Sequence, residues 1–101
     1  MYVIDQIIEQ EKKRNLEMQD VYQRRIVELP RGQLLVRTLN KGRKYCYLKY
    51  KKDGKTIAEY AGTVEVEDTL REQIARRKHF EAILSVLKKE YARMEKMEKV
   101  K

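Results

Sequence analysis

Cations and aromatic rings alternate along residues 41–55, where Lys41, Arg43, Lys44, Lys49, Lys51, Lys52 and Lys55 interleave with Tyr45, Tyr47 and Tyr50. Side chains two residues apart share one face of a β-strand, so this pattern predicts a sheet face with both ammonium groups and rings. Ammonium groups attract phosphates and tyrosine rings stack on bases. We expect a DNA or RNA contact made by Arg43, Lys44, Tyr45, Tyr47, Lys49, Lys51, Lys52 and Lys55. An ordinary solvated face with a stabilising tyrosine pair is the alternative interpretation.

Other reactive residue types are isolated along the chain. His79 and Cys46 are single residues of their kinds, and neither has a nucleophile, base or second ligand nearby in the sequence. Catalysis by a nucleophile and base, or zinc binding, requires several such groups together. The sequence therefore predicts no catalytic residue, no metal site, no cofactor and no small-molecule substrate, and the chain is not expected to be an enzyme. Basic residues 76–78, next to His79, are interpreted as a solvated turn rather than a phosphate contact.

Composition limits the fold and its surroundings. The chain has 101 residues, of which 42% are hydrophobic and 40% are charged, and its net charge is +8. This length predicts one domain over residues 1–101, with exposed helices that account for the many charges. No apolar run approaches the roughly 20 residues that span a bilayer, and no secretion signal is visible at the start. We expect a cytoplasmic protein without a membrane partner, and the single cysteine excludes an internal disulfide.

The first element is predicted to be a helix over about residues 3–28, because this stretch lacks glycine and proline. Its apolar residues at helical spacings are Ile4, Ile8, Met18, Tyr22 and Leu29. Residues 9–15 offer no apolar side chain to a core, which predicts a helix with a weak middle that is stabilised by docking at its ends and by charge pairs such as Glu9 with Lys13. Pro30 and Gly32 then end the helix.

Three strands are predicted between about residues 33 and 62, as an antiparallel meander. Asp53 and Gly54 favour a type I′ turn, which sets Lys52 opposite Lys55 and Tyr47 opposite Tyr60. The first hairpin has two alternatives. A turn that pairs residues 40 and 43 places Leu35, Leu39, Cys46, Leu48, Tyr50, Ile57 and Ala61 on the core face. A three-residue loop instead flips the first strand and moves residues 34 and 36 to that face.

The last element is predicted to be a helix over about residues 69–98, starting at a capping box of Thr69 and Glu72. Apolar residues recur along it at heptad spacing and predict a helix interface at Leu70, Ile74, Phe80, Leu84, Leu87, Tyr91 and Met94. A helix of this length extends beyond a small sheet. Its far end needs a partner, which is either the first helix, placed antiparallel, or a second copy of the chain in a homodimer through the C-terminal helix.

The expected fold is therefore α+β, with a long N-terminal helix, a three-stranded meander and a long C-terminal helix. The sequence Leu-Pro-Arg-Gly-Gln-Leu at residues 29–34, followed by Lys-Tyr-Cys-Tyr at residues 44–47, resembles a module in uncharacterised small proteins of Gram-positive bacteria and their mobile elements. That module reads as helix, LPxGxL, a tyrosine-bearing strand, a Gly-Lys turn and a helix. No active site is implied by the resemblance. The element order is also similar to the sheet and helix at the front of tyrosine-type integrases, which suggests DNA contact by a sheet face.

Two functions remain open from the sequence. The first is a small basic accessory protein of a bacterial mobile element or phage that binds nucleic acid through the meander. The second is a protein-binding module, for example a phage-type, anti-CRISPR-like inhibitor of a nucleic-acid-guided host defence, which contacts a nucleoprotein complex through its long helices.

Overall fold

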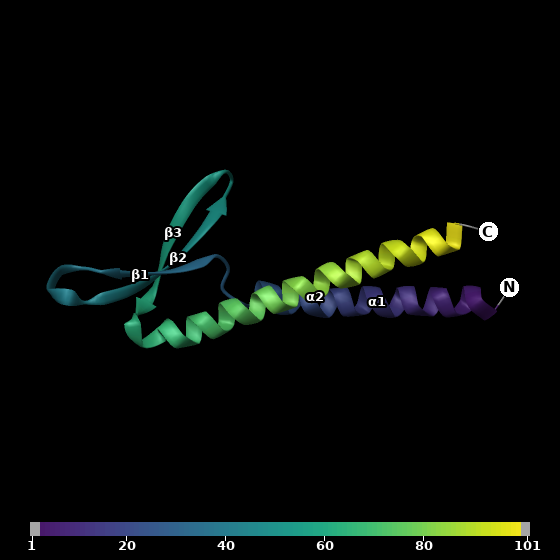
Figure 1. Ribbon diagram of the computed structural model, residues 1–101, viewed down its shortest axis with the longest axis horizontal. Helices are drawn as coiled ribbons and strands as arrows, with labels where there is room; N and C mark the ends of the chain where they lie inside the picture. Colours follow the sequence, from purple (N-terminus) through teal and green to yellow (C-terminus); the bar gives the residue numbers. More distant parts are fainter. Residues whose placement is uncertain (1–2, 100–101) are drawn as a thin grey trace. The chain divides into compact units, whose positions relative to one another are not determined.

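The computed structural model describes residues 3–99 and contains two long helices and a small sheet (Figure 1). The helices are α1, Val3–Val27, and α2, Glu67–Lys99. The strands are β1, Gln33–Thr38, β2, Lys44–Lys52, and β3, Lys55–Thr63. Short 3₁₀ turns at Asn40–Gly42 and Val64–Val66 precede β2 and α2. The strands form one antiparallel sheet in the order β1-β2-β3, so the α+β fold predicted from the sequence is confirmed.

The chain packs as two compact units. Residues 28–78 form the sheet unit, which contains the three strands and the first turns of α2. The helical unit contains α1 and the rest of α2, described over residues 3–27 and 79–99.

The second hairpin has the register that its turn predicts. Asp53 and Gly54 both have positive φ, at 52° and 78°, as a type I′ turn requires. Lys52 pairs with Lys55, and Tyr47 pairs with Tyr60. Beyond Tyr60 the pairing shifts by one residue, because Cys46 pairs with Gly62 and Ala61 is left as a β-bulge.

The first hairpin adopts the three-residue loop, so the alternative that paired residues 40 and 43 is wrong. Lys41 and Gly42 both have positive φ, at 65° and 73°, and Leu39 N donates to Arg43 O at 2.8 Å. Leu34 and Val36 therefore pair with Leu48 and Cys46 on one face, where Leu34 lines a hollow together with Ile74 and Ala75 of α2. Leu35 lies on the opposite face, and Leu39 is 49% exposed.

The core of the sheet unit centres on Cys46, which has no exposed surface. Its thiol donates to the carbonyl oxygen of Thr63 at 3.6 Å, and Ile74 of α2 is buried in the same unit. Gly62 has a φ of +143°, and a Cβ there would lie 2.8 Å from Cγ2 of Val66. Glycine is needed because it allows both this conformation and this close approach.

The helical unit is an antiparallel pair in which α1 and α2 each contribute one heptad stripe, together called the seam. Tyr22 of α1 contacts Phe80 of α2 with ring centroids 5.5 Å apart. The remaining seam residues, buried or half-buried, are Ile8, Lys12, Asn15, Gln19, Ile26, Leu84, Leu87, Tyr91, Met94 and Glu98. The first helix therefore covers the apolar seam of α2, which was one of the two partners expected from the sequence.

Polar residues fill the middle of the seam on α1, so the prediction of a weak middle with docking only at the helix ends is wrong. Asn15 is only 5% exposed and its amide donates to the carbonyl oxygen of Leu87 at 2.9 Å. Gln19 donates to Asn15 Oδ1 at 2.7 Å, and Lys12 Nζ lies 3.2 Å from Glu98 Oε1. Hydrogen bonding to Glu98 raises the pKa of Lys12 above its usual 10.5. These polar contacts fit only one alignment of the two helices.

The start of α2 also differs from the prediction. The helix begins at Glu67, which places Thr69 inside the first turn rather than at a cap, so the predicted capping box is wrong. Glu67 instead accepts hydrogen bonds from the guanidinium of Arg71, at 2.8 and 3.0 Å. Acidic residues in this first turn, Glu67 and Asp68, favour the positive end of the helix dipole.

Candidate nucleic-acid interface

One face of the sheet collects rings and cations, and pairing across the strands defines its members. Residues directly opposite one another in an antiparallel sheet point to the same side. Arg37 pairs with Tyr45, Tyr47 pairs with Tyr60, and Lys49 and Lys51 follow on β2. We call these six residues, Arg37, Tyr45, Tyr47, Lys49, Lys51 and Tyr60, the basic aromatic face. No strand residue on this side is acidic.

Three tyrosines form a cluster on the basic aromatic face. The ring centroid of Tyr60 lies 6.2 Å from that of Tyr45 and 5.7 Å from that of Tyr47, at interplanar angles of 53° and 68°. Such tilted contacts fix ring orientation. Tyr45 and Tyr47 are half-buried, whereas Tyr60 is 56% exposed. The cluster therefore holds one ring that is both oriented by its neighbours and open to solvent, as stacking on a base requires.

Arg37 belongs to this face although the sequence prediction did not include it. Its guanidinium carbon lies 5.2 Å from the centroid of the Tyr47 ring, a cation–π distance. The residue joins the face because the three-residue loop flips β1. The second alternative for the first hairpin, the three-residue loop, places Arg37 on this face.

Basic residues at the two turns extend the face. Lys52 and Lys55 flank the Asp53-Gly54 turn, and Arg43 and Lys44 follow the first turn. A shallow hollow of about 340 Å³ beside the first turn is lined by Leu39, Asn40, Lys41, Arg43 and Tyr45. Among residues 3–99, none of the lysines and arginines of the two hairpins has a salt-bridge partner.

The sheet unit has few acidic residues, and none of its strand carboxylates lies on the basic aromatic face. Residues 31–63 contain nine basic residues and two acidic ones, a net charge of +7. Asp53 occupies a turn, and Glu59 lies on the opposite face, where it accepts a hydrogen bond from the Tyr50 hydroxyl at 2.9 Å. The positive potential is therefore not cancelled on the side that carries the rings.

Several other residues singled out in the sequence have structural roles. Tyr50 lies on the opposite side of the sheet, where the guanidinium of Arg31 lies 4.2 Å from its ring centroid. Leu70 and Ile74 belong to the sheet unit, whereas Phe80, Leu84, Leu87, Tyr91 and Met94 lie in the seam of the helical unit. Arg77 donates to the carbonyl oxygen of Leu29 at 2.6 Å and so helps fix the segment after α1.

Residues 3–99 contain no group of three or more His, Cys, Asp or Glu side chains placed to hold a metal ion. His79 packs beside Phe80, with ring centroids 6.2 Å apart. Neither helix has, in the part of the chain that is described, the length and hydropathy needed to cross a bilayer. No family model, curated protein or solved structure matches this chain.

Proposed function

We propose that the sheet unit binds nucleic acid, with the basic aromatic face against the strand and the two basic turns on its phosphates. The observation that carries the proposal is the meeting of three tyrosine rings and three cations on one side of the sheet that lacks acidic residues. Cations supply the attraction to phosphates, and Tyr60 supplies a surface for stacking. Stacking on an exposed ring favours an unpaired base, so we propose a single-stranded ligand.

Salt dependence tests the electrostatic part of this proposal. Labelled single-stranded DNA, single-stranded RNA and duplex DNA of equal length are titrated by fluorescence anisotropy at several salt concentrations. If Lys49, Lys51, Lys52 and Lys55 each contact one phosphate, the slope of log K against log salt should be about −3 for the single strands. We expect both single strands to bind more tightly than the duplex.

A charge reversal with a matched control locates the surface. Changing Lys49, Lys51, Lys52 and Lys55 to Glu should abolish binding and leave the circular dichroism spectrum intact. The control changes four exposed lysines of the helical unit to Glu, at positions 13, 88, 89 and 96. This control alters the net charge by the same amount, so it should retain most of the affinity. Equal losses in both variants, or binding that survives the first, would refute the proposed surface.

Stacking is tested by Tyr60→Ala, which should weaken single-strand binding by about 1–3 kcal/mol and leave the salt slope unchanged. We expect Arg37 to contact a further phosphate. The Arg37→Ala variant should therefore have a shallower salt slope, by about the amount that one phosphate contact contributes. A Tyr60→Ala protein that binds as tightly as wild type would limit the interaction to phosphates.

A further inference from the structure

The helical unit carries a second apolar stripe that no part of the chain described here covers. On α1 the stripe contains Ile4, Ile7, Glu11, Arg14, Met18 and Val21, and on α2 it contains Ile83, Val86, Glu90, Arg93 and Met97. Its apolar members on α1 range from 38% exposed at Met18 to 69% at Ile4. Val86 and Met97 are also more than half exposed. Exposure of this kind along both helices marks an interaction surface.

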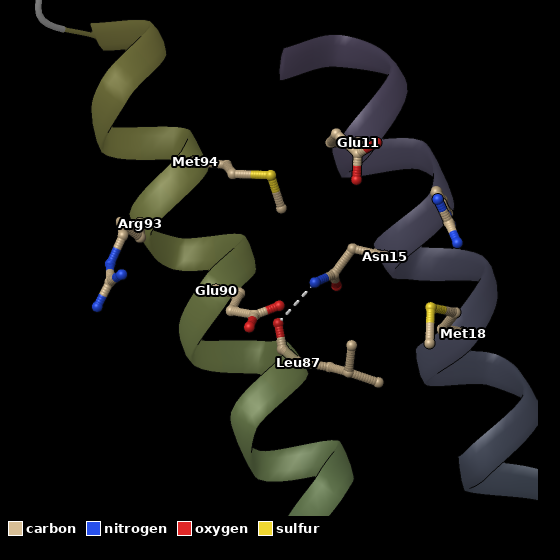
Figure 2. Close-up of a pocket in the computed structure, with 8 residues that line it drawn as sticks. Glu11, Asn15, Met18, Leu87, Glu90, Arg93 and Met94 are labelled. Carbon is tan, nitrogen blue, oxygen red and sulfur yellow. Dashed lines mark hydrogen bonds between the residues drawn. The ribbon is translucent and has the colours of Figure 1, made fainter. Parts of the chain in front are cut away.

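Both halves of the stripe lie on the same side of the helical unit. From Ile7 onward each stripe residue precedes a seam residue by one position, on α1 and on α2 alike. One residue turns an α-helix by about 100°, so the stripe is rotated by that angle from the seam. A groove of about 410 Å³ opens on this side, lined by the stripe residues Glu11, Arg14, Met18, Glu90 and Arg93 together with the seam residues Asn15, Leu87 and Met94 (Figure 2).

The stripe on α1 reads the same in both directions. About the point midway between residues 12 and 13, Ile4 mirrors Val21, Ile7 mirrors Met18, and Glu11 mirrors Arg14. Two copies of α1 laid antiparallel about this point would therefore pair apolar with apolar residues at the ends and acid with base in the middle.

Four of the five stripe residues on α2 have the same symmetry, and the position that would mirror the fifth, Ile83, lies outside the described residues. About the point midway between residues 91 and 92, Val86 mirrors Met97 and Glu90 mirrors Arg93. The two midpoints lie at nearly the same level of the helical unit, because Asn15 contacts Leu87 and Lys12 Nζ is 5.1 Å from the ring centroid of Tyr91. One two-fold axis can therefore pass through both, so that α1 meets its own copy while α2 meets its own copy.

We infer that a second copy of this chain covers the stripe and that the two helical units form an antiparallel four-helix bundle. An angle near 100° between seam and stripe is what a helix needs to contact two neighbours in a square bundle. Charge complementarity selects this occupant: among residues 3–99, none of Glu11, Arg14, Glu90 and Arg93 has an ion-pair partner within its own chain. A two-fold copy supplies an opposite charge to each of the four.

Mass measurement on the full chain tests the dimer. Light scattering coupled to size exclusion should give twice the chain mass at micromolar concentrations, and Ile7→Glu should give a monomer, because by symmetry it places two carboxylates in the apolar layers. The matched control is Leu16→Glu, an exposed leucine on α1 that lies outside the stripe and is 47% exposed. It should remain dimeric. A monomeric wild type, or a dimer unaffected by Ile7→Glu, overturns the inference.

A charge exchange tests the antiparallel pairing itself and does not disturb any packed residue. Glu11→Arg gives a chain with bases at positions 11 and 14, and Arg14→Glu gives a chain with acids at both. Each variant alone repels its own copy, so its dissociation constant should rise about 10-fold or more. An equimolar mixture should form a heterodimer as tight as the wild-type dimer, detected by native mass spectrometry. Failure of the mixture to associate would exclude this alignment, whether or not nucleic acid binds the sheet.

Discussion

Asn15 offers the sharpest test of the helical unit, because it is the one buried polar side chain among residues 3–99. Its amide nitrogen donates to Leu87 O at 2.9 Å across the seam, while its oxygen accepts from Gln19. Asn15→Asp keeps the shape and replaces the donor with a second oxygen. When the carboxyl is ionised, that oxygen has no proton to donate, so it would lie against the carbonyl oxygen of Leu87 without a hydrogen bond.

The expected loss of stability is large for an isosteric change. Losing the hydrogen bond costs about 0.5–1.5 kcal/mol, and an ionised carboxylate left against a carbonyl in a buried site costs several kcal/mol more. The Gln19 contact offsets part of this cost. We expect the free energy of unfolding at pH 7 to fall by about 3 kcal/mol.

The sign of the pH dependence distinguishes a buried charge from a simple packing defect. Burial and the Leu87 carbonyl raise the pKa of the introduced carboxyl in the folded state above about 3.9, its usual value in an unfolded chain. The unfolded state then binds fewer protons between the two pKa values, so stability falls as pH rises through them. The variant should approach wild-type stability as the pH is lowered toward 4, because the protonated acid can donate to Leu87 O.

Urea unfolding followed by circular dichroism at 222 nm, at fixed protein concentration, measures this difference at pH 7 and pH 4. Gln10→Glu adds the same charge at an exposed position of α1 and serves as the control. It should stay within about 0.5 kcal/mol of wild type at both pH values. A loss in Asn15→Asp below about 1 kcal/mol at pH 7, or a loss that is equal at the two pH values, would refute the buried hydrogen bond.

Two further predictions concern stability. Gly62→Ala should cost about 1–3 kcal/mol, because the new Cβ meets Val66 and the backbone has positive φ. Gly54→Ala, with positive φ but open space around it, should lose less in the same urea unfolding experiment, and equal losses would contradict the role of Val66. Lys12→Gln should reduce stability at neutral pH by removing the contact with Glu98. Since that contact raises the pKa of Lys12, its contribution is complete below pH 10.5 and is lost as pH rises through the raised value. The melting temperatures of Lys12→Gln and wild type should therefore converge at strongly alkaline pH. A difference that persists there would mean that Lys12 stabilises the fold by packing rather than by its charge.

The sequence predicted those parts of the sheet whose turns have a strong local preference. Asp53 and Gly54 both adopt the positive φ that their types favour, and the register of the second hairpin follows from that turn as far as the pair Tyr47 and Tyr60. In the first turn Lys41 has a φ of 65°, a conformation that lysine rarely adopts and that its residue type therefore does not predict. Two registers were therefore equally consistent with the sequence, and they differ in whether Val36 or Arg37 joins the rings of β2. The candidate site depends on this choice, because it adds a third cation to the basic aromatic face.

The helix boundaries were harder to predict than the helices themselves. Thr69 and Glu72 satisfy the spacing of a capping box, but the helix starts two residues earlier, where Glu67 finds a partner in Arg71. Glu67 and Asp68 are good first-turn residues in either position, so local preferences alone do not separate the two starts.

The pattern of α1 was difficult to interpret because two faces of the helix carry information at once. Ile8 and Tyr22 belong to the seam, whereas Ile4 and Met18 belong to the stripe one residue away, so the sequence prediction combined residues of different faces. Between them the seam is polar, which hides it from any search for apolar periodicity. A polar seam is nevertheless informative, since its hydrogen bonds fix the alignment that apolar side chains would leave free to slip. That alignment brings the two mirror points of the stripe to one level, at Lys12 and Tyr91. The buried amide of Asn15 and the self-complementary stripe are thus linked: if the seam shifted by one turn, α1 and α2 could no longer share a two-fold axis.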